Sequence, residues 1–393
     1  MARDDKPYRI YRGGRTKGKV PSAGRRTSPA RGSDDGGAPA APPPYRGPNA
    51  VPTRKGRRRV GPWIVLGLVV LIALMVAWGV FGYLSVSHGV KKANARLDPD
   101  AKALLTKQSG LLVSHPTTIL LLGTDNSDLA SRAGDDHSDS IMLLRTDPEH
   151  HRLYFLSIPR DLEVPIPGGG TQKINAAYQL GGAALSIRTI KQFTGLEIDH
   201  VMEVNFGAFK DLIDAIGGIT VNVPKPIRSN RFDCPYKTQA QCLRWPGWRF
   251  EKGTQHMNGQ RALVYSRIRE NMLDPAETDI TRGARQQAVI DAVTGKLTSI
   301  GSLFRLPFRG SSYVKPLTTD LTAAQLVQLG WVKFRASGGS AVHCRLGGDL
   351  GGGGTGSPSE DNPATLAMFL GRSAPQPPTD PFGPGCVVGH TLQ

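Results

Sequence analysis

The chain has 393 residues, enough for one to three domains with a sizeable core. It carries 49 Lys and Arg against 32 Asp and Glu, a formal net charge of +17. Residues 1–59 hold 16 of these basic and 4 of these acidic side chains, so most of the excess belongs to this segment. The composition excludes collagen, a coiled coil and a transporter with many membrane spans.

Residues 1–59 consist mostly of Arg, Gly, Pro, Ala and Asp, with almost no large apolar side chains. Such a segment buries too little surface to offset its ordering entropy, so we expect it to be disordered. Basic tails bind nucleic acid or anionic lipid in other proteins. No helix-turn-helix pattern and no interleaved aromatic residues accompany these charges. We therefore interpret the tail as a solvated segment that sets membrane orientation, and we expect no nucleic-acid partner.

An apolar run without a charged residue covers residues 60–86. About 20 apolar residues cross a bilayer as a helix, so this run predicts one transmembrane helix. A basic cluster at residues 54–59 precedes it, and the positive-inside bias then puts the N-terminus in the cytoplasm and the rest outside. A cleaved signal peptide is the alternative, but its apolar core is shorter and lies closer to the N-terminus.

The rest of the chain alternates predicted strands and helices. A polar, partly helical stalk is expected at residues 87–112, a folded extracytoplasmic domain at 113–345 and a Gly/Pro-rich C-terminal extension at 346–393. Short apolar runs predict strands at 117–123, 140–145, 153–158, 201–204 and 219–223. Helical spacing appears at 183–193, 208–216, 258–269, 281–297, 321–336 and near 364–370, whereas 301–320 is expected to be irregular. This alternation predicts an α/β fold: a single α/β/α sandwich with a mixed central sheet.

Four cysteines stand at positions 234, 242, 344 and 386. Outside the membrane an even number favours disulfides. Of the three possible connectivities, the simplest joins Cys234 to Cys242 and Cys344 to Cys386. A catalytic thiol at Cys344, with the adjacent His343 as its base, is the alternative, and sequence adjacency is weak evidence for it.

Two acidic residues stand at predicted strand ends. Asp125 directly follows TILLLGT, and Asp139 directly precedes SIMLLR. Adjacent strands of one sheet would bring the two carboxylates to one cavity. Mg²⁺ is typically held by one or two carboxylates together with phosphate oxygens and waters. Asp is also an ordinary turn residue at such positions, which is the alternative.

Arginines gather in three short motifs: SIPRD, YSRIR and DITRGARQQ. In the last motif, residues 282, 285 and 286 are spaced i, i+3 and i+4, so they share one helix face. Guanidinium groups bind phosphate oxygens bidentately and keep their charge at any working pH. Several of them in one pocket suit a diphosphate better than a carboxylate. Surface ion pairing with Asp161, Glu270 and Asp279 is the alternative.

The sequence resembles the LytR-CpsA-Psr family. The resemblance rests on TTILLLGTD, HSDSIMLL, FLSIPRDLEVPIPG, KINAAYQLGG, GGITVNV, MNGQRALVYSRIR and DITRGARQQ, which follow one another in the family's order over residues 115–300. A cytoplasmic tail, one anchor and an extracytoplasmic domain also match that family. The composition of the tail and the cysteine-bearing insertion look actinobacterial.

The resemblance implies a transferase of cell-wall assembly in the cell membrane. Such enzymes move a phosphoglycopolymer from a polyprenyl pyrophosphate carrier to peptidoglycan, usually to the 6-hydroxyl of N-acetylmuramic acid. It implies that Asp125 and Asp139 hold Mg²⁺. As a hypothesis on the mechanism, a carboxylate such as Asp139 or Asp161 accepts the proton of the attacking hydroxyl, and the sequence does not decide between the two. The expected catalytic residues are Asp125, Asp139, Arg160 and Asp161. The expected pyrophosphate contacts are Arg160, Lys173, Arg267, Arg269, Arg282, Arg285 and Gln286.

Two positions depart from the family pattern. Asn126 and Ser127 stand where many members have an arginine shortly after the first acid, and His137 stands where many have an arginine before the Ser-Asp pair. Imidazole is mostly neutral at pH 7, so two of the usual pocket cations are replaced. Arg132 or Arg145 is the candidate for compensation.

Two other functions use the same sequence features. A hydrolase or pyrophosphatase of lipid-linked diphosphates would use the same residues, with water in place of the sugar hydroxyl. A non-catalytic membrane-tethered regulator would use the basic tail as its working part.

Overall fold

The computed structural model describes residues 61–107, 110–124, 138–231, 234–236, 238–274, 279–336, 341–350, 356–379 and 383–389. The chain divides into two units, Met1–Arg59 and Val60–Gln393, and all described residues belong to the second. The tail that the sequence predicts to be disordered therefore lies outside the described residues.

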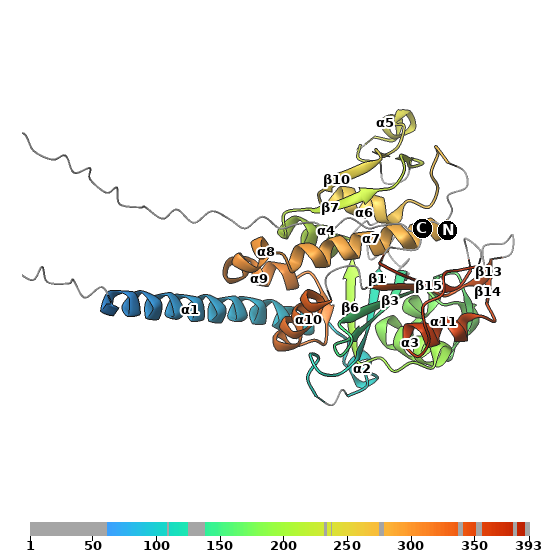
Figure 1. Ribbon diagram of the computed structural model, residues 1–393. Helices are drawn as coiled ribbons and strands as arrows, with labels where there is room; N and C mark the ends of the chain where they lie inside the picture. Colours follow the sequence, from blue (N-terminus) through green and yellow to red (C-terminus); the bar gives the residue numbers. More distant parts are fainter. Residues whose placement is uncertain are drawn as a thin grey trace, which may run out of the picture. The chain divides into compact units, whose positions relative to one another are not determined.

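A seven-stranded mixed sheet forms the centre of the second unit, with the strand order β11-β6-β1-β2-β3-β12-β15 (Figure 1). β1 runs parallel to β6, and β3 runs parallel to β12, whereas the other neighbours are antiparallel. The expected mixed sheet is confirmed. Its strands are β1 (Thr117–Thr124), β2 (Ser138–Asp147), β3 (Arg152–Ile158), β6 (His200–Asn205), β11 (Thr318–Thr319), β12 (Val342–Arg345) and β15 (Gly385–Val388).

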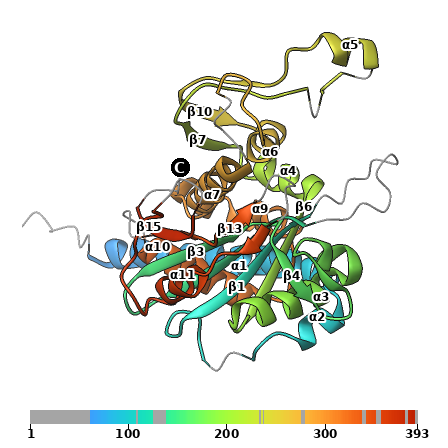
Figure 2. The same cartoon turned by 90° about the vertical axis from the view of Figure 1, so that its right-hand side faces the viewer.

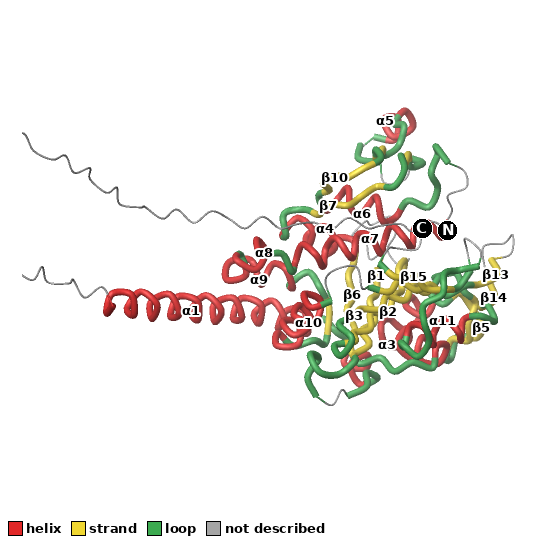
Figure 3. Tube along the Cα trace, viewed as in Figure 1, coloured by secondary structure: helices red, strands yellow, loops and turns green. Residues whose placement is uncertain are grey.

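Helices cover both faces of this sheet, so its central strands are apolar on both sides. On one face Leu143 shares a core with Ile187 of α3 (Ala176–Thr194) and Phe369 of α11 (Asn362–Phe369). On the other face Phe155 shares a core with Val332 of α10 (Ala323–Arg335), and α7 (Asp279–Leu297) adds Ile290. Figure 3 shows the strands gathered between these helices. The expected α/β/α sandwich is thus confirmed.

A second packing unit continues from α7. It comprises α1 (Gly61–Asn94), α4 (Phe206–Ala215), α6 (Gly259–Arg267), α9 (Leu306–Val314) and the antiparallel pair β7 (Ile219–Val223) and β10 (Gly253–Met257), which share one hydrophobic core. Between β7 and β10 the chain forms β8 (Ile227–Arg228), α5 (Gln239–Arg244) and β9 (Arg249–Phe250). Both views place α5 beyond β7 and β10, away from the central sheet (Figures 1 and 2).

The remaining described elements are short. They are α2 (Pro99–Ala103), α8 (Ile300–Phe304), the hairpin of β4 (Glu163–Ile166) and β5 (Gly170–Lys173), and the pair β13 (Gly348–Leu350) and β14 (Gly356–Pro358). The irregular conformation expected for residues 301–320 is wrong, because α8, α9 and β11 occupy that segment. Ser299 caps α8 through its side chain, and Pro307 stands in the first turn of α9, where a missing N–H costs nothing.

The ends of the domain differ from the sequence-based boundaries. α1 does not stop at residue 86 but continues to Asn94, and Val90 and Ala93 enter the core. Leu97, Ala101 and Leu112 are buried too, so residues expected to form a stalk are part of the domain. Likewise, the expected C-terminal extension supplies α11 and the edge strand β15.

Two disulfides join Cys234 to Cys242 and Cys344 to Cys386, the pairs that the sequence suggested as simplest. The second links β12 to β15, where Cys344 stands opposite Cys386 in the ladder. The catalytic-thiol alternative at Cys344 is excluded, because its sulfur is bonded. His343 instead stacks on Phe155, with ring centroids 5.2 Å apart.

Candidate functional site

Four strand ends meet at one edge of the central sheet. β1 ends at Thr124, which pairs with Asn205 at the end of β6 and with Ser138 at the start of β2. β3 ends at Ile158, opposite Ile141 of β2, and Arg160 follows two residues later. The carboxyl ends of β1, β3 and β6 therefore lie together, which is where ligands bind in open α/β sheets.

The start of β2 contains a β-bulge at Asp139. Gly123 pairs with Ser140 and Thr124 with Ser138, so Asp139 is the extra residue in the ladder. Its backbone thus lies beside the strand end that Asp125 follows in sequence. Asp125 lies outside the described residues, as do Asn126, Ser127, Arg132 and His137, and the side chain of Asp139 is not described.

The arginine–glutamine face of α7 points toward this edge. The hydroxyl of Ser140 donates to Oε1 of Gln286 at 3.1 Å, which ties α7 to β2 one residue from Asp139. Nε2 of Gln286 donates to the carbonyl of Ser266 at 3.5 Å, and Nη2 of Arg285 donates to the carbonyl of Ile268. Arg282 and Arg285 are both buried. The spacing of residues 282, 285 and 286 predicted that they share a helix face, and in the structure Arg285 and Gln286 on that face contact the YSRIR segment.

Arg267 is held at the same edge by an aromatic ring. Its guanidinium carbon lies 4.2 Å from the centroid of Phe206, within the range of a cation–π contact. Phe206 begins α4 directly after β6, and the side chain of Asn205 caps that helix by accepting from the Ala208 N–H at 2.7 Å. Arg269, two residues further on, is exposed.

A second charged group follows β3. Nε of Arg160 lies 3.4 Å from Oδ2 of Asp161, and Nζ of Lys173 lies 3.0 Å from Oδ1 of the same carboxylate. The Asn175 N–H donates to the carbonyl of Arg160 at 3.2 Å, which binds the KINAAY segment to the PRD segment. Each oxygen of Asp161 is thus paired with a cation, and this carboxylate orients both.

A partly buried carboxylate at this edge, Glu203, was not predicted from the sequence. The hydroxyl of Tyr178 donates to Oε2 of Glu203 at 3.0 Å, and Glu203 lies two residues before the end of β6. Burial raises the pKa of Glu203 above its usual range, and the hydrogen bond from Tyr178 opposes that shift. The signal in the sequence was an acid within an otherwise apolar stretch of the strand, HVMEVN.

The structure therefore brings most of the expected site residues to one sheet edge, in two groups. One contains Arg267, Arg282, Arg285 and Gln286 beside the bulge at Asp139, and the other contains Arg160, Asp161 and Lys173. Among the described residues there is no cluster of three His, Cys, Asp or Glu side chains that would hold a metal ion by itself. The arrangement concentrates guanidinium and ammonium groups, which suits a ligand with several phosphate oxygens.

The chain is similar in sequence to known proteins of one family. The model of the LytR_cpsA_psr family matches residues 80–340. A polyisoprenyl-teichoic acid–peptidoglycan teichoic acid transferase, TagU of Bacillus mycoides, is 32% identical over 272 residues, covering 68% of this chain and 81% of the relative. TagV of Bacillus subtilis, with the same activity in its name, is 30% identical over 244 residues, covering 61% of this chain and 59% of the relative.

Solved structures show the same fold. A structure described as TagT bound to LI-WTA superimposes with a TM-score of 0.50 at 25% identity, covering 67% of this chain and 94% of that one. The crystal structure of B. subtilis TagV gives a TM-score of 0.51 at 27% identity, covering 66% and 98%.

Proposed function

Because the chain belongs to the LytR_cpsA_psr family, we propose that it transfers a phosphate-linked glycopolymer from a polyprenyl pyrophosphate carrier to peptidoglycan. The acceptor in this proposal is the 6-hydroxyl of N-acetylmuramic acid. The observation that carries it is the gathering of Arg267, Arg282, Arg285 and Gln286 at one sheet edge. The names of the TagU and TagV relatives, which act on polyisoprenyl-linked teichoic acid, support the class of donor.

The proposed reaction is a phosphoryl transfer. The oxygen of the acceptor hydroxyl bonds to the phosphorus that carries the glycan, and the bond from that phosphorus to the bridging oxygen breaks. Polyprenyl phosphate leaves with the bridging oxygen, and the hydroxyl proton passes to a carboxylate. Such reactions depend mostly on positioning and on stabilising negative charge. The arginines would neutralise the charge that develops on the departing phosphate.

Two acids were expected as alternatives for the proton acceptor, and their surroundings differ. Both oxygens of Asp161 face cations, Arg160 at 3.4 Å and Lys173 at 3.0 Å. We therefore assign Asp161 a positioning role, in which it aims Arg160 and Lys173 at the donor. Asp139, at the bulge beside the end of β1, is the proposed proton acceptor.

We also propose that Asp125 and Asp139 hold Mg²⁺. Asp139 would do so through one carboxylate oxygen, which leaves its other oxygen to accept the proton. The bulge puts the backbone of Asp139 next to the strand end that Asp125 follows, so the register is compatible with a shared ion. Two carboxylates fit an ion that takes its other ligands from phosphate and water. When bound, Mg²⁺ would supply further positive charge at the pyrophosphate.

The proposed location is the cell membrane, with a cytoplasmic N-terminus and an extracytoplasmic catalytic domain. Among the described residues α1 is the one helix long and apolar enough to cross a bilayer. The basic run at residues 54–59 sets the orientation, and two disulfides suit an oxidising compartment.

Transfer is tested with the full chain in detergent micelles. The protein is incubated with a short-chain polyprenyl-pyrophosphoryl glycan, Mg²⁺ and a peptidoglycan fragment, and products are identified by mass spectrometry. A glycan joined to the fragment through a phosphodiester supports the proposal. Glycan phosphate released without an acceptor, and never joined to one, would instead support the hydrolase.

A further inference from the structure

Large apolar side chains stand exposed on α8 and on the first turn of α9. Ile300 is 73% exposed, Phe304 68% and Phe308 84%, and the neighbouring Leu303 is exposed as well. Contiguous exposed apolar surface marks a site of contact with protein or membrane. None of these side chains belongs to the candidate catalytic edge, so the proposed reaction leaves them without a role.

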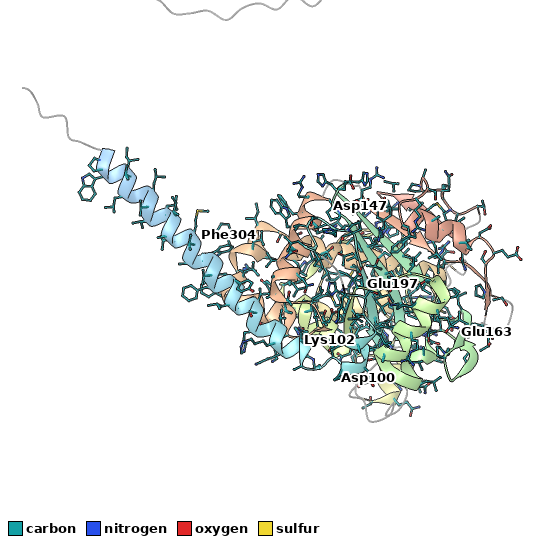
Figure 4. The ribbon with its side chains drawn as sticks, turned by 90° about the horizontal axis from the view of Figure 1, so that it is seen from below. Asp100, Lys102, Asp147, Glu163, Glu197 and Phe304 are labelled. Carbon is teal, nitrogen blue, oxygen red and sulfur yellow. A yellow bond between two sulfur atoms is a disulfide. The ribbon has the colours of Figure 1, made fainter. Side chains whose placement is uncertain are left out.

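This apolar segment lies against α1. The indole Nε1 of Trp78 donates to the carbonyl of Phe304 at 3.3 Å, and the two rings are 6.0 Å apart. One turn later Gly82 faces Leu306 and Pro307, with 3.4 Å from its ideal Cβ position to Leu306. Figure 4 shows Phe304 beside α1. The exposed segment is therefore continuous with the apolar surface of the membrane helix.

The burial of α1 changes at the same level. From Gly61 to Phe81 no residue is buried, and Trp78 alone is partly covered. From Gly82 onward one face packs into the domain through Val86, Gly89, Val90 and Ala93. The part of α1 without a buried residue, residues 61–81, is 21 residues long. At 1.5 Å per residue it spans about 31 Å, close to the roughly 30 Å of a bilayer's hydrocarbon core.

The contact between α1 and α9 fixes the height of the apolar segment. An ideal Cβ on Gly89 would lie 2.8 Å from the carbonyl oxygen of Ser311, and one on Gly310 would lie 2.9 Å from Cγ2 of Val86. The Ser311 N–H also donates to the hydroxyl of Ser85 at 3.1 Å. α9 is therefore packed closely against α1, and Phe304 lies level with Trp78.

The charge of the segment also suits a bilayer surface. Residues 300–315 contain no Asp or Glu, and Arg305 and Arg309 are exposed between the apolar side chains. A short amphipathic segment with basic and aromatic residues lies in the headgroup region and gains further from anionic lipids. Tryptophan also favours that level of the bilayer.

We propose that α8 and the first turn of α9 insert into the leaflet next to the catalytic domain, beside the transmembrane part of α1. Ile300, Phe304 and Phe308 contact acyl chains, and Arg305 and Arg309 contact lipid phosphates. The domain is then held to the membrane at two adjoining points and keeps one orientation. This inference rests on the membrane location in the proposed function, but not on the chemistry.

Photo-crosslinking of the full chain tests this placement. The chain is reconstituted without substrate in vesicles of phosphatidylcholine and phosphatidylglycerol, with p-benzoylphenylalanine in place of Phe304 or Phe308. Leu71 of α1 is the position expected inside the bilayer, and Leu243 of α5 is a matched exposed apolar residue far from α1. We expect lipid adducts at positions 304, 308 and 71, and none at 243.

The outcomes distinguish insertion of α8 and α9 into the leaflet from the crossing of the bilayer by α1. Adducts at 71 but not at 304 or 308 overturn the insertion of α8 and α9, while the transmembrane helix stands. Cross-links from 304 or 308 to a second copy of the chain overturn it as well, because the surface is then a protein interface. The absence of adducts at 71 shows that α1 does not span the bilayer, which overturns the membrane location and this inference together.

Discussion

Arg267 holds its guanidinium carbon 4.2 Å from the ring of Phe206, so its position at the sheet edge is fixed before any ligand binds. Arg267→Ala is expected to lower kcat/KM for transfer by about 100-fold or more, the order observed when one preorganised donor is removed. Arg267→Lys should recover only part of the lost kcat/KM, because an ammonium group lacks the planar fork of a guanidinium group. Steady-state kinetics of transfer measure both.

The control for Arg267 is Arg249, an exposed arginine 2.6 Å from Glu251 in the insertion around α5. Arg249→Ala is expected to leave kcat/KM unchanged. An equal loss in the two alanine variants would show that general charge, and not the edge site, governs turnover.

Substitution of Asp161 tests whether this carboxylate positions its cationic neighbours or accepts the proton of the acceptor hydroxyl. If it aims Arg160 and Lys173, Asp161→Asn raises KM for the donor by about 30-fold and leaves most of kcat, since the two pairings together are worth roughly 2 kcal/mol at this exposure. If it accepts the proton, kcat falls by about 10²–10⁴ with KM little changed. Separate determination of kcat and KM decides, and a selective loss of kcat would contradict the assignment.

Much of the site at the level of single residues was predictable, but its contacts were not. The spacing of Arg282, Arg285 and Gln286 predicted their common face because helix periodicity is local. The partners on that face, Ser140 and the carbonyls of Ser266 and Ile268, lie far away in sequence. Glu203 was missed because its burial depends on how α3 and β6 pack.

α7 carries the arginine face near its start and a partly buried carboxylate, Asp291, further along. Burial raises the pKa of Asp291 from 3.8 to about 6, with Lys333 opposing that shift, and its Oδ2 lies 3.5 Å from Nε2 of His343. The folded state then binds more protons than the unfolded state between about pH 4 and 6. Stability contributed here is present at low pH and lost as the pH rises through 6.

Asp291→Asn is accordingly expected to raise the free energy of unfolding at pH 8. The gain is about 1–2 kcal/mol, from roughly 1.4 kcal/mol per pKa unit reduced for partial exposure. It should shrink toward zero near pH 4. Urea titrations at the two pH values measure it, and a loss at pH 8 would mean that an ion pair with His343 outweighs desolvation.

The two disulfides close loops of different length within the fold. Cys344 and Cys386 are 42 residues apart and link two strands of the sheet, whereas Cys234 and Cys242 are 8 apart in the insertion. Chain entropy alone predicts that the free energy of unfolding falls by about 4 kcal/mol when Cys344 and Cys386 are replaced by serine. For Cys234 and Cys242 the predicted decrease is about 2.5 kcal/mol. Denaturant unfolding of the two double variants measures them, and the reverse order would contradict this account.

Among the elements, those with a clear local pattern were predicted well, including the five-residue strand β7, whereas α8, α9 and β15 were not. β1, β3 and α7 carry continuous patterns that specify their structure locally. α8, α9 and β15 are short, and each contacts a partner far away in sequence: α1 for α8 and α9, and β12 for β15. The same reason explains why residues 87–112 resembled a stalk, since their burial comes from tertiary packing.

For the whole molecule, α1 stands in sequence between the basic tail and the domain that carries the candidate site. Deleting residues 1–59 is expected to leave transfer per molecule unchanged, because the site lies at the edge of the sheet and α1 remains intact. If deleting residues 1–59 abolished the protein's function in cells while Arg267→Ala left that function intact, the non-catalytic regulator would be supported instead. Deleting residues 1–94 also removes Val86, Val90 and Ala93 from a core and should lower the melting temperature.

The most direct test of the account measures binding at the sheet edge without catalysis. Isothermal titration calorimetry compares a short-chain polyprenyl pyrophosphate with the corresponding monophosphate, using the full chain in detergent micelles. A pyrophosphate site at this edge predicts that the wild type and Arg249→Ala bind the pyrophosphate more tightly than the monophosphate. Arg267→Ala is expected to lose this preference. Equal affinity of the wild type for both lipids, or an unchanged preference in Arg267→Ala, would contradict a pyrophosphate site at this edge.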